Sequence, residues 1–499
     1  MNDHPQQDDS TLIQTGIPGL DDVLRGGLTP NRLYLIEGNP GSGKTTLALQ
    51  FLLTGVKRGE RCMFATLSET SDELRASAES HGWTLDGIDI LEIVASEDSL
   101  KSDARYTMFH PSEVELAETT KAVLAEAARI KPARLVIDSV SEFRLLAENP
   151  LRYRRQILAL KQYFSRQHAT VLFIDDRTSD ESDMHLHSLA NGVISLEREA
   201  VEYGTVRRRL QVAKVRARSY REGYHDFVIR RGGLEVFPRL VASEHRGSLA
   251  GAAVKSGLEE LDTLLGGGLA QGSSTLILGP AGAGKSSLAT QFLLAATARG
   301  EHATVFLFDE SVATFRERSA GLGMDVDSQI DAGHLAVQQI DPAELSPGEF
   351  AHCVRRAVDD DKTRVVVIDS LNGYMNAMPS ERFLVLHLHE LLGYLGQRGV
   401  TTLLLMAQHG LIGIETESPL EASYLADTVL LLRYFEAFGE VRKAISVIKK
   451  RTGKHERTIR ELVVDGRLRI GEPIREFQSV LTGSPMLVGE ATKNTESAQ

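Results

Sequence analysis

The chain has 499 residues and a formal charge of −12, and its 42% hydrophobic and 25% charged residues lie close to globular averages. This composition excludes a disordered or fibrous protein, and two cysteines exclude a disulfide framework or a multi-cysteine zinc site. No run approaches the ~18 apolar residues of a membrane span, and the first residues, MNDHPQQDDS, lack the features of a signal peptide. We therefore expect a cytoplasmic globular protein without a membrane segment, of about three domains by length alone.

An internal repeat changes that domain count. The segment from Gly16 to Leu28 is repeated from Gly257 to Leu269, and both copies precede an apolar strand and a glycine-rich loop. The offset between the copies is 241 residues at first and falls to 231 at Asp138 and Asp369, which predicts an insertion in one half. A period of this length indicates a whole domain duplicated in tandem, so we expect two domains.

Each half alternates short apolar runs with helical patterns, as in RLYLIEG, TTLALQFLLTGVKRG and CMFATLSE. This order predicts an α/β fold, with a mainly parallel sheet that is covered by helices on both faces. The predicted boundaries are a flexible N-terminus at 1–10, a first domain at 11–238, a linker at 239–252, a second domain at 253–471 and a flexible tail at 472–499.

Both halves contain the pattern G-x-x-x-x-G-K-[ST] between a predicted strand and a predicted helix. The glycines let backbone N–H groups point at phosphate oxygens, and the helix adds its positive N-terminal end. The lysines are expected to reach the β- and γ-phosphates, and the hydroxyls of Thr45 and Ser286 to bind Mg²⁺. The predicted ATP-binding residues are Gly38, Asn39, Pro40, Gly41, Ser42, Gly43, Lys44, Thr45, Thr46, Gly279, Pro280, Ala281, Gly282, Ala283, Gly284, Lys285, Ser286 and Ser287.

Acidic residues follow two further strands in each half. Asp138 and Asp369 close β-branched runs, where a carboxylate can hold the Mg²⁺ hydration shell; a helix-capping role is the alternative. Glu69, Asp309 and Glu310 follow the strand after the first helix, and we predict that they orient or deprotonate the attacking water. The alternative for these three is that they are solvated loop acids.

Two other features leave alternatives open. Residues 205–221 hold seven basic residues in a strand-like pattern, which fits contacts to a nucleotide, a solvated basic face or a nucleic-acid surface. Gln408 ends the run TTLLLMAQ and could sense the γ-phosphate, or it is an ordinary polar residue at a strand end; Asp175 or Asp176 ends the matching strand of the first half.

The tandem loops, the acids after the next strand, the Asp-Ser strand ends and a Lys-x-Arg in each half together resemble the KaiC family of circadian-clock ATPases, within the RecA superfamily. The resemblance covers residues 11 to 485. It implies tandem RecA-like P-loop domains and a double-ring homohexamer that binds ATP and Mg²⁺ between neighbouring subunits. It also implies slow ATP hydrolysis and, in clock members, autokinase and autophosphatase activity of the second domain. The resemblance assigns contacts with the neighbouring subunit's ATP to Lys214, Arg216, Lys449 and Arg451.

The sequence departs from the family at two places. The family has two adjacent glutamates in each domain, but this chain has Ser68–Glu69 and Asp309–Glu310. First-domain hydrolysis is therefore expected to rest on Glu69 alone and to be slow or lost. The family's Ser-Thr phosphorylation pair aligns with Ser423 and Tyr424, so Ser423 is the candidate phosphosite and an ordered two-site cycle is not expected.

The expected function is that of an ATP-hydrolysing hexameric switch with ATP and Mg²⁺ as cofactors, and with autokinase activity as a further expectation. Its expected partners are copies of itself and clock or signalling proteins, and not nucleic acid or a membrane. A DNA-acting RecA-like or helicase-like motor is the first alternative. A regulatory scaffold that binds ATP with little turnover is the second.

Overall fold

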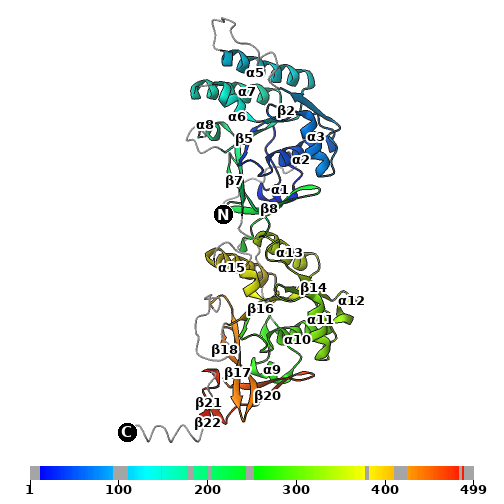
Figure 1. Ribbon diagram of the computed structural model, residues 1–499, viewed down its shortest axis with the longest axis vertical. Helices are drawn as coiled ribbons and strands as arrows, with labels where there is room; N and C mark the ends of the chain where they lie inside the picture. Colours follow the sequence, from blue (N-terminus) through cyan, green and yellow to red (C-terminus); the bar gives the residue numbers. More distant parts are fainter. Residues whose placement is uncertain are drawn as a thin grey trace, which may run out of the picture. The chain divides into compact units, whose positions relative to one another are not determined.

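The computed structural model describes residues 12–93, 111–147, 149–177, 184–200, 204–242, 252–376, 381–408, 424–482 and 486–487. The chain divides into two compact units, Met1–Arg239 and Leu240–Gln499, and Figure 1 labels many of their elements. We call these units the first and the second domain. Among the described residues, no helix is both long enough and apolar enough to cross a bilayer.

The first domain is built around a nine-stranded sheet in the order β3-β2-β4-β5-β1-β6-β7-β8-β9. The strands from β3 to β6 are parallel, and the pairs from β6 to β9 are antiparallel. The strands are β1 Leu33–Gly38, β2 Cys62–Thr66, β3 Ile88–Glu92, β4 Arg134–Asp138, β5 Thr170–Asp176, β6 Gly192–Glu199, β7 Arg207–Val215, β8 Tyr224–Arg230 and β9 Gly233–Phe237.

The second domain repeats this topology in the order β14-β13-β15-β16-β12-β17-β18-β19-β20. Small two-stranded sheets, β10 with β11 and β21 with β22, accompany it. The strands are β10 Ala253–Val254, β11 Leu269–Ala270, β12 Ser274–Gly279, β13 His302–Leu307, β14 Leu335–Gln339, β15 Thr363–Asp369, β16 Thr401–Ala407, β17 Thr428–Ala437, β18 Glu440–Lys450, β19 Arg460–Val464, β20 Leu468–Pro473, β21 Phe477–Gln478 and β22 Met486–Leu487. The predicted α/β fold, with tandem RecA-like domains around mainly parallel sheets, is confirmed.

Helices cover both faces of each sheet (Figure 1). In the first domain, one face carries α1 Pro18–Val23, α2 Lys44–Lys57 and α3 Ser71–Ser80, and the other carries α5 Pro111–Ile130, α6 Val140–Ala147, α7 Pro150–Arg166 and α8 Met184–Leu189. In the second domain, one face carries α9 Glu259–Leu264, α10 Lys285–Ala298, α11 Val312–Gly321 and α12 Val326–Asp331. The other face carries α13 Pro347–Asp359, α14 Leu371–Asn376 and α15 Glu381–Gln397.

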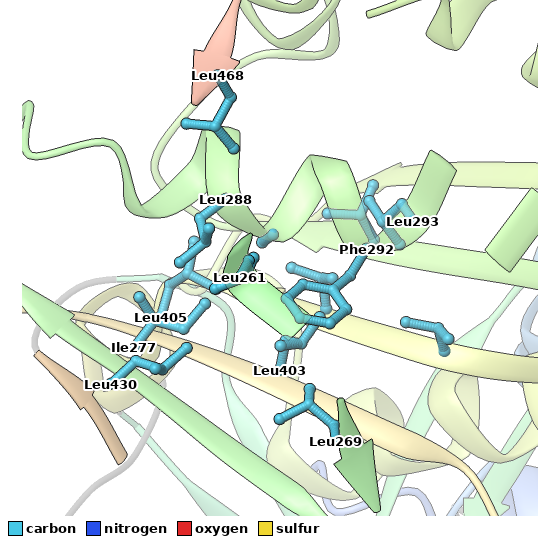
Figure 2. Packing of buried hydrophobic residues seen from close by; sticks show 14 of the residues in the cluster. Leu261, Leu269, Ile277, Leu288, Phe292, Leu293, Leu403, Leu405, Leu430 and Leu468 are labelled. Atoms are coloured by element: carbon cyan, nitrogen blue, oxygen red, sulfur yellow. The ribbon is translucent and has the colours of Figure 1, made fainter. Parts of the chain in front are cut away.

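Alternating side chains of the central strands supply the two cores. In β1, Tyr34 and Ile36 face the α2 side, whereas Leu33 and Leu35 face the α7 side, as the two-residue period of a strand requires. Figure 2 shows the second domain's equivalent of the α2 side, where Phe292 and its neighbours on α10 pack over the strands. The labelled residues of this core are Leu261, Leu269, Ile277, Leu288, Phe292, Leu293, Leu403, Leu405, Leu430 and Leu468.

The length difference between the halves arises from two insertions, whereas the sequence comparison predicted one. Ile88 and Leu335 occupy equivalent positions on the edge strands, which is an offset of 247 residues. The second domain gains α12 before this point, and the first domain gains residues between β3 and α5. The fall from 241 to 231 is therefore the net result of two opposite changes.

Part of the segment predicted as a C-terminal tail is packed structure. Val480 is 1% exposed and lies in a small apolar cluster with Phe435, Ala437 and Ala444, which Phe477 covers. Within the predicted linker, Leu240 is buried in the core of the second domain. The boundaries of the linker and of the tail stay predictions.

Candidate functional site

Each phosphate loop joins a central strand to a helix, β1 to α2 and β12 to α10. The loops turn at their last glycine, where Gly43 has a φ of 104° and Gly284 a φ of 102°. A Cβ at Gly43 would also lie 2.5 Å from Ile229 Cδ1, so the Ile229 side chain would have to move. No side chain caps α2 or α10 in the described structure, so the first N–H groups of both helices remain available to an anion.

The lysine of each loop folds back onto the loop backbone. Lys44 Nζ donates to the carbonyl oxygens of Gly38 at 2.9 Å and Asn39 at 3.1 Å. Lys285 Nζ makes the two equivalent bonds, at 3.0 and 2.8 Å. Burial lowers the pKa of Lys285, and nearby carboxylates oppose this effect. Both ammonium groups therefore lie within their loops, where a phosphate is expected.

The hydroxyl and carboxylate predicted to serve Mg²⁺ lie together in both domains. Thr45 Oγ1 donates to Asp138 Oδ2 at 3.2 Å, and the Ser286 hydroxyl lies close enough to Asp369 to oppose the rise in the pKa of that carboxyl. Burial, with the nearby Glu69, raises the pKa of Asp138 to about 7, and burial also raises the pKa of Asp369. The peptide bond after each aspartate is cis. These buried carboxylates hold their charge at a cost that a cation would offset.

The acid predicted for catalysis in the first domain, Glu69, follows β2, which lies beside β4 in the sheet. The Thr66 hydroxyl fixes its backbone, because it donates to Glu69 O at 2.6 Å and accepts from Glu69 N at 3.1 Å. Burial and Glu73 raise the pKa of Glu69, whereas Lys44 opposes the rise. Glu69 thus interacts electrostatically with both the loop lysine and Asp138.

The corresponding acids of the second domain have partners. Glu310 forms an ion pair with Arg318 of α11, with Oε1 and Nη2 2.6 Å apart. Asp309 accepts a hydrogen bond from the hydroxyl of Ser370. The residue at the place of Arg318 in the first domain is Ser77, so this ion pair belongs to the second domain. Asp309 also lies close enough to Lys285 to affect its pKa.

A further carboxylate reaches the lysine of the first loop. Asp176, the last residue of β5, lies opposite the end of β1, and its Oδ1 is 2.8 Å from Lys44 Nζ. The residue at the same register position in the second domain is Ala407. The side chain of Asp176 is 44% exposed, whereas that of Lys44 is 9% exposed.

The structural equivalent of Gln408 is Arg177, and not Asp175 or Asp176. The backbone N–H of Gln408 and that of Arg177 each donate to the last carbonyl of the loop-bearing strand, at 3.1 and 3.2 Å. Asp175 instead accepts hydrogen bonds from Ser141 at 2.7 Å and from Arg144. Gln408 Oε1 is buried and has no hydrogen-bond partner among the described residues.

A polar cluster that the sequence analysis missed stands next to the first loop. Glu37, at 6% exposure, accepts a hydrogen bond from Ser195 Oγ at 2.5 Å and contacts His187 Nε2 at 2.6 Å. Burial raises the pKa of Glu37, but these two bonds outweigh it, so the pKa lies below its usual value. Leu278 and Leu431 replace Glu37 and Ser195 in the second domain. The sequence did contain a signal for this cluster, namely a charged residue inside the apolar run LYLIEG. No sequence signal pointed to the ion pair of Arg318.

Lys214 and Arg216 lie at the end of the first sheet opposite the phosphate loop. Lys214 Nζ donates to the carbonyl of His187, and Arg216 Nη2 donates at 2.5 Å to the next carbonyl. A cavity of about 250 Å³ lined by Arg32 and Lys161, among others, opens nearby. Burial and the neighbouring cations lower the pKa values of Lys161 and Lys214. This end of the domain is therefore suited to an anion.

The second domain arranges its Lys-x-Arg pair similarly. Lys449 Nζ donates to the carbonyl of Ala426 at 2.8 Å, and Arg451 Nη2 to that of Tyr424 at 2.5 Å. Arg451 also pairs with Asp427 at 3.3 Å, so its charge is partly neutralised. The candidate phosphosite Ser423 lies outside the described residues.

Comparison with known proteins agrees with this arrangement. The family described as KaiC, an ATPase family, matches residues 13–241 and again 254–468. The circadian clock protein KaiC3 of Synechocystis sp. is 26% identical over 497 residues, which cover 96% of this chain and 95% of that protein. The circadian clock oscillator proteins KaiC of Picosynechococcus sp. and Synechococcus elongatus are 28% and 26% identical, over 97% of this chain and 94% and 93% of theirs. Since the family pattern covers most of both halves, the chain belongs to the KaiC family of ATPases.

Proposed function

We propose that this chain is a hexameric ATP-driven switch that binds MgATP at both phosphate loops and hydrolyses it slowly. The observation that carries the proposal is the duplicated geometry. In each domain a lysine lies on the loop carbonyls, and a Ser or Thr hydroxyl lies beside the aspartate that ends the strand next but one in the sheet. Family membership supports ATP as the nucleotide.

The donor set of each site fits Mg²⁺. Hydroxyl and carboxylate oxygens are the ligands that this hard cation prefers, and Thr45 with Asp138, or Ser286 with Asp369, supplies both. Ser42 Oγ is buried in the first loop without a hydrogen-bond partner among the described residues, as a polar atom awaiting a ligand would be. Bound Mg²⁺ would neutralise phosphate charge in the transition state.

The protein's own residues divide the remaining work. Lys44 and Lys285 hold the β- and γ-phosphates, and the loop N–H groups bind the phosphate oxygens. Glu69 in the first domain, and Asp309 and Glu310 in the second, orient the attacking water and accept its proton as the γ-phosphorus–oxygen bond to ADP breaks. Glu310 pairs with the Arg318 cation, whereas Asp309 accepts a hydrogen bond from the neutral Ser370 hydroxyl.

Self-association forms the next part of the proposal. Lys214 and Arg216 stand beside a cation-lined cavity, and the equivalent Lys449 and Arg451 occupy the same place in the second domain. Cations at this end of the sheet would stabilise the γ-phosphate of a neighbouring subunit's ATP. The circadian names of the relatives suggest signalling partners, and an autokinase activity would act on Ser423.

Phosphate release from the whole chain tests the ATPase. Lys44→Ala and Lys285→Ala should each lower turnover, and the double variant should abolish it. Lys57→Ala, at the exposed end of α2, is the matched control and should keep wild-type turnover. Unchanged turnover in the double variant would refute the proposal.

Mass measurements test the finer parts. Light scattering with ATP should give a hexamer and, without ATP, smaller species. Intact mass after incubation with ATP should show one added phosphate that Ser423→Ala removes. An unmodified hexamer would leave the ATPase alone, and a monomer under both conditions would overturn the ring.

The nucleic-acid alternative rests on the basic strand β7, where Arg209 already pairs with Glu197 at 3.2 Å and stacks over Tyr224. Severalfold stimulation of turnover by single-stranded DNA, with salt-sensitive binding, would favour a motor instead.

A further inference from the structure

The two loop lysines differ in the ion pairs that they form. Lys44 donates to two loop carbonyls and also forms an ion pair with Asp176, with Nζ and Oδ1 2.8 Å apart. Lys285 makes the same two carbonyl bonds, and Ala407 stands where Asp176 would be. Among the described residues, Lys285 therefore has no ion-pair partner that a phosphate must displace, whereas Lys44 has one.

The local charge differs in the same direction. The first site places three carboxylates, those of Glu69, Asp138 and Asp176, around Lys44. The second site also has three, those of Asp309, Glu310 and Asp369, but two cations, because Arg318 joins Lys285. The first site thus lacks the cation that Arg318 supplies beside the acids of the second site. The charge of Asp176 extends into the cation site, since it contributes to the raised pKa of Asp138.

We propose that Asp176 competes with the nucleotide phosphate for Lys44 and so makes the first domain bind nucleotide more weakly than it otherwise would, a restraint that the second domain lacks. This proposal rests on the proposed function, because it takes both loops to be nucleotide sites. Asp176 is half exposed, so its side chain can turn towards water when a phosphate displaces it. An ion pair of this exposure contributes modestly, which makes Asp176 an adjustable restraint rather than a block.

Nucleotide binding to single-site chains tests the proposal. With Lys285→Ala silencing the second domain, Asp176→Ala should bind a fluorescent ATP analogue about threefold to tenfold more tightly than the parent. With Lys44→Ala silencing the first domain, Ala407→Asp should weaken binding by a similar factor. Asp86→Ala, which removes an exposed carboxylate, is the matched control and should change nothing. A misfolded variant would not gain affinity for the ATP analogue. Tighter binding by Asp176→Ala therefore distinguishes loss of competition from a folding defect.

Other results would overturn the proposal. Unchanged affinity of Asp176→Ala would show that the ion pair does not compete with the phosphate. Weaker binding only when Mg²⁺ is present, and not in EDTA, would identify Asp176 as a metal-site residue instead. Binding that persists in the Lys44→Ala/Lys285→Ala double variant would instead refute the loops as nucleotide sites, which is the failure of the proposed function.

Discussion

Asp138 is a buried carboxylate whose charged form opposes folding. It is 7% exposed, and burial with the nearby Glu69 raises its pKa to about 7. Because the folded-state pKa lies above that of the unfolded chain, this group favours folding at low pH, and that contribution is lost as the pH rises from about 4 to about 7. At pH 8 the metal-free protein holds an unfavourable buried charge.

Replacing Asp138 with Asn should therefore raise the melting temperature of the metal-free first domain at pH 8. A gain on the order of 1 kcal/mol corresponds to about 2–4 °C for a domain of this size. The gain should shrink towards pH 5, where Asp138 is already protonated in the folded state. Calorimetry at both pH values provides the measurement, with Asp86→Asn as the exposed control. If Asp138→Asn and the parent protein melt at the same temperature at pH 8, Asp138 does not carry an unfavourable buried charge.

Among the elements, β1, β6 and α8 are joined in the first domain by the polar cluster of Glu37, Ser195 and His187. The second domain solves the same packing problem with Leu278 and Leu431. A buried pair of polar residues and a buried pair of apolar residues are both stable. A mixed pair of one polar and one apolar residue leaves a polar atom without a partner.

Single and double substitutions in this cluster should therefore be non-additive. Glu37→Leu alone should lower the free energy of unfolding by about 1–3 kcal/mol, because Ser195 Oγ loses its acceptor. Glu37→Leu combined with Ser195→Leu should recover part of the loss, since it recreates the pair of the second domain. Urea unfolding of the four corners of this cycle measures the coupling. A double variant that loses the sum of both singles would show that the two residues act independently.

The mainly parallel sheet, the helical layers and the position of the loops followed from patterns that depend on local periodicity, whereas the strand order did not. The Gly-rich loop, Lys44 and Asp138 were predictable because strand ends of a parallel sheet converge on one edge. The ion pair of Lys44 with Asp176 was not, since Asp175 and Asp176 are equivalent by composition and only the register of β5 decides which one faces the loop. The pair of Glu310 with Arg318 depends on how α11 is oriented, which no spacing rule fixed.

In the whole molecule, each domain has its own cores and its own phosphate loop. The residues that pack on the two faces of the first sheet belong to the first domain alone, and those of the second sheet to the second. Cores that share no residues should unfold as separate cooperative units.

Calorimetry with a non-hydrolysable ATP analogue and Mg²⁺ should therefore show two transitions, both shifted upwards. At a ligand concentration 100-fold above Kd, each domain gains about 2.7 kcal/mol. Lys44→Ala should remove the shift of one transition and Lys285→Ala that of the other. A single transition that either variant moves as a whole would show that the domains unfold together.

The carboxylates around the two loops also constrain how the halves can diverge. Ser68 in the first half corresponds to Asp309 in the second, and Asp176 corresponds to Ala407. The two positions lie at the ends of the strands on either side of the strand that carries Asp138 or Asp369. Each half thus has three acids around its loop. The two halves differ in which of the two flanking strands supplies the third acid. A half that carried both would place four carboxylates around one loop lysine, and a half that carried neither would keep two. The two positions are therefore expected to be epistatic, so that the order of substitutions decides which evolutionary intermediates can bind nucleotide.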